Sequence, residues 1–160
     1  MNTDSRNEFR VRRRRFSDLT TEELYALLML RQNVFVVEQS CLYTDIDNKD
    51  QTASHLLAVD TRDCLVGCCR IHLPNEQHSE AVISRVVTAA DVRGRKLGHR
   101  LIREATDFCK SQAPRSAVRL AAQSHLIGFY QQHGFQPAGA EYIEDGIPHV
   151  DMIRPIGSSD

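Results

Sequence analysis

No long hydrophobic run occurs in this chain, although 41% of its 160 residues are hydrophobic. None of its apolar segments approaches the ~18 residues that a transmembrane helix requires. No apolar stretch of the kind found in signal peptides follows the N-terminal arginines. We therefore expect a cytoplasmic protein without a membrane span. The length is typical of one globular domain, so we expect a single domain over residues 1–160, with flexible tails at about 1–8 and 156–160.

Zinc-binding spacing and complete disulfide pairing are also missing. The sequence contains five cysteines, which fit no zinc pattern and whose odd number prevents all of them from pairing within one chain. We expect no metal, and free thiols that mostly pack in the core; a covalent cysteine mechanism is the alternative. The five are Cys41, Cys64, Cys68, Cys69 and Cys109.

The chain has no large excess of charge, because its net charge is −1. Basic residues concentrate only near the N-terminus, at Arg6, Arg10 and Arg12–Arg15. Such an arm can bind nucleic-acid phosphates, but no aromatic stacking pattern accompanies it. The segment from Phe9 to Phe16 also has the pattern of an edge strand, where charges block unwanted pairing. We therefore expect no nucleic-acid partner.

A complete calcium loop is absent as well. Asp45, Asp47 and Asp50 alternate like the first ligands of an EF-hand, but the glycine and glutamate expected at its sixth and twelfth positions are replaced by Asp50 and Leu56. We interpret the segment as a solvated loop that attracts a cationic amine, with turn-forming aspartates as the alternative. Two strand arginines are expected to form ion pairs with this loop: Arg70 and Arg85.

The most informative segment is residues 93–98, Arg-Gly-Arg-Lys-Leu-Gly. It follows the β-branched run Ala81–Thr88, which predicts a strand, and it opens a segment whose apolar residues recur at helical spacing from Leu97 to Phe108. The free N–H groups at such a helix start form an anion site. The loop lacks the Gly-Lys-Ser/Thr ending of a Walker motif and the glycine spacing of a Rossmann fingerprint.

The order of predicted elements indicates an α/β fold with a mixed sheet and helices on both faces. After the strand from Phe9 to Phe16, Thr20 and Glu23 form a capping box for a helix. Later segments predict two strands joined by the turn 60–63, the strand and helix around the loop, a strand at 117–122, a helix at 124–133, and strands at 140–143 and 149–153. Gly134 and Phe135 end the second of these helices.

Residues 93–98 resemble the Arg-x-x-Gly/Ala-x-Gly pyrophosphate loop of the GNAT superfamily of N-acetyltransferases, which cradles the diphosphate of acetyl-coenzyme A. Lys96 stands where that pattern usually has glycine. Either the backbone reaches the pyrophosphate with a side chain attached, or the lysine itself contacts a phosphate. Three longer blocks, Leu30–Gln39, Cys41–Asp50 and Glu144–His149, are similar to the ElaA-like branch of this superfamily, whose acceptors are poorly defined.

The resemblance covers about residues 16–154 and implies the GNAT acyltransferase fold and direct attack of an amine on acetyl-CoA. By this resemblance Tyr130, which precedes Gly134-Phe135, protonates the departing thiolate, and backbone N–H groups of a strand bind the acetyl carbonyl. A tyrosine that only packs on the sheet is the alternative. The implied cosubstrate-binding residues are Val86, Val87, Thr88, Arg93, Gly94, Arg95, Lys96, Leu97, Gly98, His99 and Gln123.

The acceptor amine also needs a base. Glu38 is our first choice, although it could equally be a buried carboxylate that ties the first loop. His149, at the start of the last predicted strand, is the second. Three further candidates are His55, His125 and Glu144. For His55 the alternative is a partner for loop backbone, and for His125 it is a helix cap. A non-catalytic module that binds coenzyme A or a protein is the alternative function, and the sequence leaves open whether the chain forms a homodimer.

Overall fold

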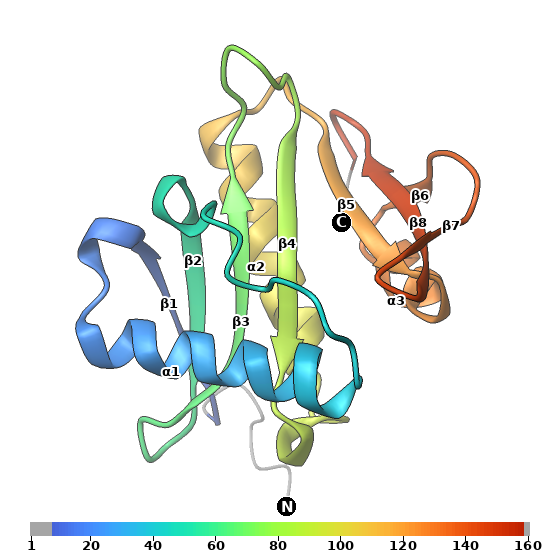
Figure 1. The fold of residues 1–160 in the computed structure, drawn as a ribbon. Helices are drawn as coiled ribbons and strands as arrows, with labels where there is room; N and C mark the ends of the chain where they lie inside the picture. Colours follow the sequence, from blue (N-terminus) through green and yellow to red (C-terminus); the bar gives the residue numbers. More distant parts are fainter. Residues whose placement is uncertain (1–7, 159–160) are drawn as a thin grey trace, which may run out of the picture. The chain divides into compact units, whose positions relative to one another are not determined.

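The computed structural model describes residues 8–158 (Figure 1). These residues form two compact units. The first unit is the described part of Met1–Arg70 together with Arg85–Leu101, and the second is Ile71–Ser84 with the described part of Ile102–Asp160. Arg6 and the rest of residues 1–7 of the first expected tail, and residues 159–160 of the second, lie outside the described residues. No helix in residues 8–158 is both long and apolar enough to cross a membrane.

The first unit holds strands β1 (Arg10–Arg15) and β2 (Ser54–Val59), most of β3 (Leu65–His72) and the second half of β4 (Ala81–Thr88). Its helical elements are η2 (Phe16–Asp18), α1 (Thr21–Arg31), the π-helical η3 (Gln32–Glu38), η4 (Asp50–Thr52), η5 (Ala90–Val92) and the start of α2 (Leu97–Gln112). The second unit holds the remaining parts of β3, β4 and α2, and β5 (Val118–Gln123), η6 (Ser124–Leu126), α3 (Ile127–Gln131), β6 (Gln136–Pro137), β7 (Tyr142–Glu144) and β8 (Ile147–Arg154).

The strands form a mixed sheet of eight strands in the order β1-β2-β3-β4-β5-β8-β6, with β7 paired to β8. β4 and β5 are parallel, whereas β1–β2, β5–β8, β6–β8 and β7–β8 are antiparallel. The predicted α/β fold class with a mixed sheet is therefore confirmed. So is the edge position of the arginine-rich first strand.

Helix α1 begins where the sequence predicts. The Thr20 hydroxyl accepts from the Glu23 N–H at 3.1 Å, and the Glu23 carboxylate accepts from the Thr20 N–H at 3.1 Å. These two bonds satisfy otherwise free N–H groups of the first turn. At its other end α1 runs directly into η3, whose last residue is Glu38.

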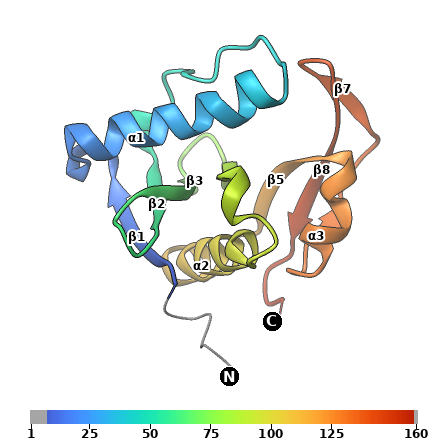
Figure 2. The same ribbon diagram turned by 90° about the horizontal axis from the view of Figure 1, so that it is seen from below.

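In the first unit, α1 and the start of α2 lie on opposite faces of strands β1 to β3 (Figure 2). Leu27, Leu30 and Val34 pack against strand residues Leu57 and Cys68 on one face. On the other face Gly67 lets α2 approach closely, because a Cβ at this glycine would lie 3.1 Å from the Leu97 side chain and 3.2 Å from that of Leu101. The start of α2, and with it the loop before it, is thus seated directly on β3.

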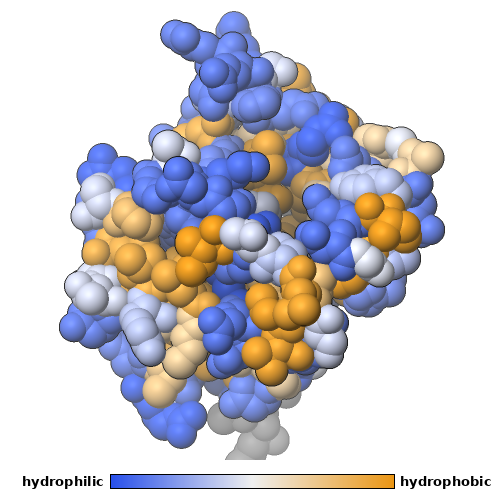
Figure 3. Space-filling view, in the orientation of Figure 1, coloured by the Kyte–Doolittle hydropathy of each residue, from blue (hydrophilic) through white to orange (hydrophobic). Residues whose placement is uncertain are grey.

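The outer face of α1 and the segment after it carry exposed apolar side chains. Figure 3 shows hydrophobic groups gathered on the face that α1 covers in Figure 1. Exposed apolar groups gathered in this way are typical of surfaces that meet another molecule. The exposed residues are Tyr25, Met29, Val37, Leu42 and Ile46.

In the second unit the predicted helix 124–133 is only partly correct. Residues 124–126 form a 3₁₀ turn, and the α-helix covers Ile127–Gln131. The segment has no side-chain N-cap, and at its end the N–H groups of His133 and Gly134 bond to carbonyls three residues back. Tight turns therefore replace α-helical turns at both ends. Gly134, with φ +78°, ends the element as predicted.

Two other local predictions are confirmed. Asp145 and Gly146 join β7 to β8 with φ values of +51° and +80°, the conformation of a tight hairpin turn. None of the five cysteines, all of which lie within residues 8–158, is in a disulfide, and four of them are buried while Cys64 is exposed.

Candidate functional site

The loop at residues 93–98 belongs to the first unit and leads into α2 at Leu97. Gly94 has φ +78° and Lys96 has φ +62°. The left-handed region is open to glycine but costs an L-residue about 1–2 kcal/mol. The position at which the GNAT pattern usually has glycine therefore has the backbone conformation that favours glycine, although lysine occupies it.

The two arginines of this loop are engaged by carboxylates of the same unit. Arg93 forms a two-point ion pair with Glu38, and Arg95 pairs with Glu8 while its guanidinium lies 5.1 Å from the centre of the Phe9 ring. Lys96 is exposed and makes no side-chain hydrogen bond or ion pair within residues 8–158. It is therefore the loop cation that remains available to an anion.

Glu38 lies at the end of η3 with its side chain 42% exposed. The alternative of a buried carboxylate is therefore wrong. Its two oxygens accept from Arg93 Nη1 at 2.5 Å and Nη2 at 2.9 Å. These hydrogen bonds and the charge of Arg93 lower the pKa of Glu38, although slight desolvation opposes them. A carboxylate stabilised in this way is a weaker base than an unpaired one.

The expected acyl-binding segment Val86–Thr88 is the end of β4 and also lies in the first unit. Arg85, immediately before it, has φ +54°, so the extended backbone is interrupted there. The ladder between β4 and β5 covers only Ala81 and Val82 of β4. The carbonyl of Thr88 accepts from Arg93 Nη2 at 3.3 Å. The role of the backbone N–H groups in this segment stays a prediction.

Tyr130 belongs to the second unit, where its ring is held in an aromatic cluster. It is 6% exposed and meets the edges or faces of Phe129 at 5.0 Å and Phe135 at 6.1 Å between ring centres. Its carbonyl accepts from the N–H of Phe135 at 3.3 Å, which closes the turn at Gly134. Packing therefore explains the position of the ring, and the role of the hydroxyl as an acid stays a prediction.

Gln123 and His149 are brought together as cross-strand neighbours of β5 and β8 in the second unit. His149 Nδ1 lies 2.8 Å from the carbonyl oxygen of Ile147. Since a carbonyl can only accept, Nδ1 carries the proton and the neutral ring keeps its lone pair on Nε2. Nε2 lies 3.9 Å from the Glu144 carboxylate, and the ring stacks on Tyr142 with 6.0 Å between centres.

The β7–β8 hairpin that carries His149 is fixed by polar contacts of its own. The Tyr142 hydroxyl donates to Asp151 at 2.8 Å, and Arg119 bonds to both Asp151 and Glu80. Burial, and next the hydrogen bond to Asp151, raise the pKa of Tyr142 to about 12. Tyr142 is therefore a hydrogen-bond donor at neutral pH, and it holds the stacked His149 ring in place.

Two other candidate bases, His55 and His125, differ in burial. His55 is 1% exposed, and its Nε2 lies 3.0 Å from the carbonyl of Asp50, as expected of a partner for loop backbone. Burial lowers its pKa, although the hydrogen bond to Asp50 opposes the shift. His125 is exposed in η6.

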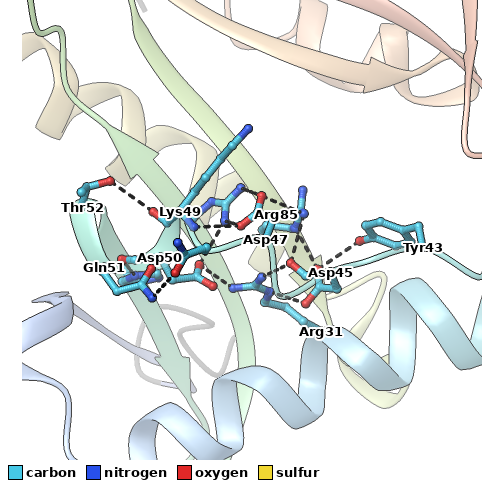
Figure 4. Close-up of polar contacts among 12 residues, drawn as sticks. Arg31, Tyr43, Asp45, Asp47, Lys49, Asp50, Gln51, Thr52 and Arg85 are labelled. Atoms are coloured by element: carbon cyan, nitrogen blue, oxygen red, sulfur yellow. Dashed lines mark hydrogen bonds and ion pairs between the residues drawn. The ribbon is translucent and has the colours of Figure 1, made fainter.

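The acidic segment is not a solvated loop, and this expectation is wrong. Asp45 is 7% exposed and Asp50 is 4% exposed, because both bond to Arg31, which is 0% exposed (Figure 4). Arg70 bonds to Asp47 at 2.7 Å and Asp50 at 3.1 Å. Arg85 bonds to Asp45 at 2.8 Å. The guanidinium groups of three arginines thus neutralise the three carboxylates of this segment.

The predicted pairing of Arg70 and Arg85 with this segment is confirmed. Arg31, which lies at the centre of the ion-pair network, was not predicted from the sequence. Burial alone raises the pKa of Asp50, yet the guanidinium groups of Arg31 and Arg70 outweigh it and the net shift is downward. The signal for Arg31 lies in its spacing. It follows Leu27 and precedes Val34 on the buried face of the helix, where an arginine needs carboxylate partners.

The N-terminal arginines are also largely paired. Arg10 and Arg12 both bond to Asp63, at 2.8 and 2.9 Å, and Arg15 bonds to Asp18 at 2.9 Å. In the part of the chain that is described, no group of three or more His, Cys, Asp or Glu residues is placed to hold a metal ion.

Comparison with known proteins places these features in a family. A model of the acetyltransferase (GNAT) domain matches residues 17–154. The ElaA protein of Escherichia coli K12 is 43% identical over 142 residues, which are 88% of this chain and 92% of ElaA. A Synechocystis protein of the UPF0039 group is 36% identical over 87% of this chain and 90% of its own length.

Solved structures agree with this relationship. The crystal structure of E. coli ElaA has a TM-score of 0.85 at 42% identity, covering 91% of this chain and 99% of ElaA. An acyl-CoA N-acyltransferase from Pseudomonas aeruginosa has a TM-score of 0.85 at 38% identity, with the same coverage of 91% and 99%. The resemblance to the GNAT superfamily and to its ElaA-like branch is therefore confirmed.

Proposed function

The chain belongs to the GNAT acetyltransferase family, and from that premise we propose that it transfers an acetyl group from acetyl-CoA to a primary amine of a small molecule or peptide. Membership of the family supports the coarser activity, an acyl-CoA-dependent acyltransferase. The acetyl donor and the amine acceptor are our proposal. The observation that carries it is the loop at residues 93–98, with glycine-type backbone at Gly94 and Lys96 directly before a helix of 16 residues.

In this proposal the loop binds the pyrophosphate of the cosubstrate. Backbone N–H groups at the start of a helix favour anions, and the lysine adds a full charge. Arg93 and Arg95 are already neutralised by Glu38 and Glu8. We therefore assign the side-chain phosphate contact to Lys96 and the remaining contacts to backbone N–H groups, from Arg93 through His99.

The reaction we propose is direct attack of the neutral amine on the thioester carbonyl. N–H groups of Val86, Val87 and Thr88 stabilise the oxygen on which negative charge develops. Gln123 binds the pantetheine arm, and the hydroxyl of Tyr130 protonates the thiolate as it leaves. The attacking nitrogen passes one proton to a base, so that the amide product and free coenzyme A balance the reaction.

We propose His149 as that base in preference to Glu38. The Nδ1–H bond to the Ile147 carbonyl leaves the Nε2 lone pair available to accept a proton. Both oxygens of Glu38, in contrast, accept from Arg93. The two bonds from Arg93 make the Glu38 carboxylate a weaker base, whereas Nε2 of His149 has a lone pair that can accept the proton.

The test measures acetyl transfer from acetyl-CoA to a panel of amines, peptides and polyamines. The free thiol of the released coenzyme A is the readout. Tyr130→Phe should lower kcat by about 10²-fold, the lower end of general acid contributions, while its ring still packs against Phe129 and Phe135. Tyr25→Phe, at a tyrosine that is 72% exposed on α1, is the matched control. Binding of coenzyme A without transfer to any amine, and with no effect of Tyr130→Phe, would favour the non-catalytic module.

A further inference from the structure

Glu38 and Arg93 join two segments of the first unit that lie 55 residues apart in the chain. Glu38 is the last residue of the π-helical η3, and Arg93 is the first residue of the loop before α2. π-Helical turns inside helices occur frequently at functional sites. Here the widened turn ends at the carboxylate that meets the loop.

The contact has the two-point geometry of a strong arginine–carboxylate pair. Nη1 donates to one Glu38 oxygen at 2.5 Å and Nη2 to the other at 2.9 Å. Nη2 also donates to the Thr88 carbonyl at 3.3 Å. Two parallel bonds fix the orientation of the guanidinium as well as its position. Arg93 therefore links three segments: the end of η3, the end of β4 and the start of the loop.

This arrangement is poorly suited to a role of Glu38 as the base for the amine and to a role of Arg93 as a phosphate ligand. Glu38 offers no unpaired oxygen to an ammonium group, and its pKa is lowered by Arg93. Nη1 of Arg93 donates to Glu38, and Nη2 donates to Glu38 and to the Thr88 carbonyl, so both nitrogens are directed at protein acceptors. Lys96, in contrast, has no such partner within the described residues. The pair therefore serves the shape of the loop.

We infer that Glu38 is a positioning residue: by holding Arg93, it fixes the start of loop 93–98 in the conformation that binds the pyrophosphate, and it takes no proton from the amine. The inference rests on the proposed function for its ligand. It assigns to Glu38 an effect on cosubstrate affinity and none on the chemical step.

The experiment compares Glu38→Gln, Glu38→Arg, Arg93→Glu and the charge-swapped double variant Glu38→Arg/Arg93→Glu. Coenzyme A affinity is measured by calorimetry, and kcat and KM for acetyl-CoA are measured in the transfer assay. Since an exposed ion pair contributes only modestly, we expect Glu38→Gln to raise Kd and KM about fivefold. The kcat of Glu38→Gln should stay within about twofold of the wild-type value at each pH measured. Glu22→Gln, at an exposed glutamate of α1, is the control.

The charge swap separates the two roles of Glu38. A positioning pair predicts that the double variant regains most of the affinity that each single reversal loses. A catalytic base predicts a loss in kcat of about 10²-fold or more in Glu38→Gln, without recovery in the swap. That result, or unchanged affinity in Glu38→Gln, would overturn the inference.

Hydrogen exchange of the loop amides distinguishes failure of this inference from failure of the proposed function. If the wild-type protein binds no coenzyme A, the proposed function fails. Exchange at residues 94–98 still reports on the pair, because loosening the start of the loop exposes these amides more often. Faster exchange in Glu38→Gln than in Glu22→Gln supports the positioning role, and equal exchange overturns it.

Discussion

The Nη1 atom of Arg31 donates to Oδ1 of Asp50 at 2.8 Å, between two side chains that are 0% and 6% exposed. An arginine so deeply buried is tolerated only because carboxylates surround it. Burial by itself would lower the pKa of Arg31, but hydrogen bonds and charge interactions with Asp50 and Asp45 reverse the shift and raise it. Removal of one partner would leave a buried charge without compensation.

Asp50→Ala is therefore expected to lower the free energy of unfolding by about 3 kcal/mol. Asp63→Ala is the matched control in the same unit, since Asp63 also pairs with two arginines but is 59% exposed. It should change stability by less than ~1 kcal/mol. Urea unfolding followed by circular dichroism measures both. If the two variants lose the same free energy of unfolding, the buried ion pairs of Arg31 contribute no more to stability than the exposed pairs of Asp63.

Lys96 provides a second prediction, because two substitutions can separate the strain of its backbone from the charge of its side chain. Lys96→Gly removes the cost of φ +62° together with the charge, whereas Lys96→Ala removes only the charge. If the lysine contacts phosphate, both variants should raise the Kd for coenzyme A about fivefold or more and reduce the dependence of binding on salt. Thermal unfolding should show Lys96→Gly to be the more stable of the two.

The control for this loss of charge is Lys110→Ala, at an exposed lysine in the last turn of α2. It removes the same charge far from the start of the helix, so the Kd for coenzyme A should stay close to that of wild type. If instead Lys96→Gly and Lys96→Ala both bind coenzyme A as well as wild type does, the side chain makes no contact with phosphate. The backbone N–H groups alone would then account for the anion site.

The contrast between these two sites shows what the sequence could and could not predict. Loop 93–98 was predictable because its conformation is local: glycine and helical spacing indicate a turn before a helix. The pairing of Arg31 with Asp45 and Asp50 is not local, since it joins α1 to residues 14 and 19 positions later. Three aspartates in a polar segment look like a solvated loop until the fold brings arginines from a helix and two strands to them.

The same reason explains Glu38. In the sequence it follows an apolar run, which suggests a buried carboxylate, but the π-helical η3 turns it outward to Arg93. A π-helical turn changes which side chains share a face, and the helical spacing used in sequence analysis does not anticipate it. The longer strands, the capping box at Thr20 and the turn at Gly146 depend on local patterns and agree with the prediction. The two-residue strand β6 was not predicted, and β7 lies at Tyr142–Glu144 where a strand was expected at 140–143.

His55 predicts a pH dependence of stability. Burial lowers its pKa in the folded protein, so near pH 6 the unfolded chain binds more protons at this residue than the folded chain does. Stability is therefore expected to fall as the pH drops below the ordinary histidine pKa of about 6.5, and to keep falling until the folded pKa is reached. His55→Gln should flatten this part of the curve of unfolding free energy against pH. A curve unchanged in slope would contradict the assignment.

His149 gives the sharpest test of the chemistry. Nδ1 is committed to the Ile147 carbonyl, so Nε2 holds the only lone pair that the proposed base has. His149→Gln should therefore lower kcat by about 10²-fold, whereas His125→Gln, at an exposed histidine of η6, should leave kcat close to that of wild type. A kcat that stays close to wild type in His149→Gln would assign the base to another residue.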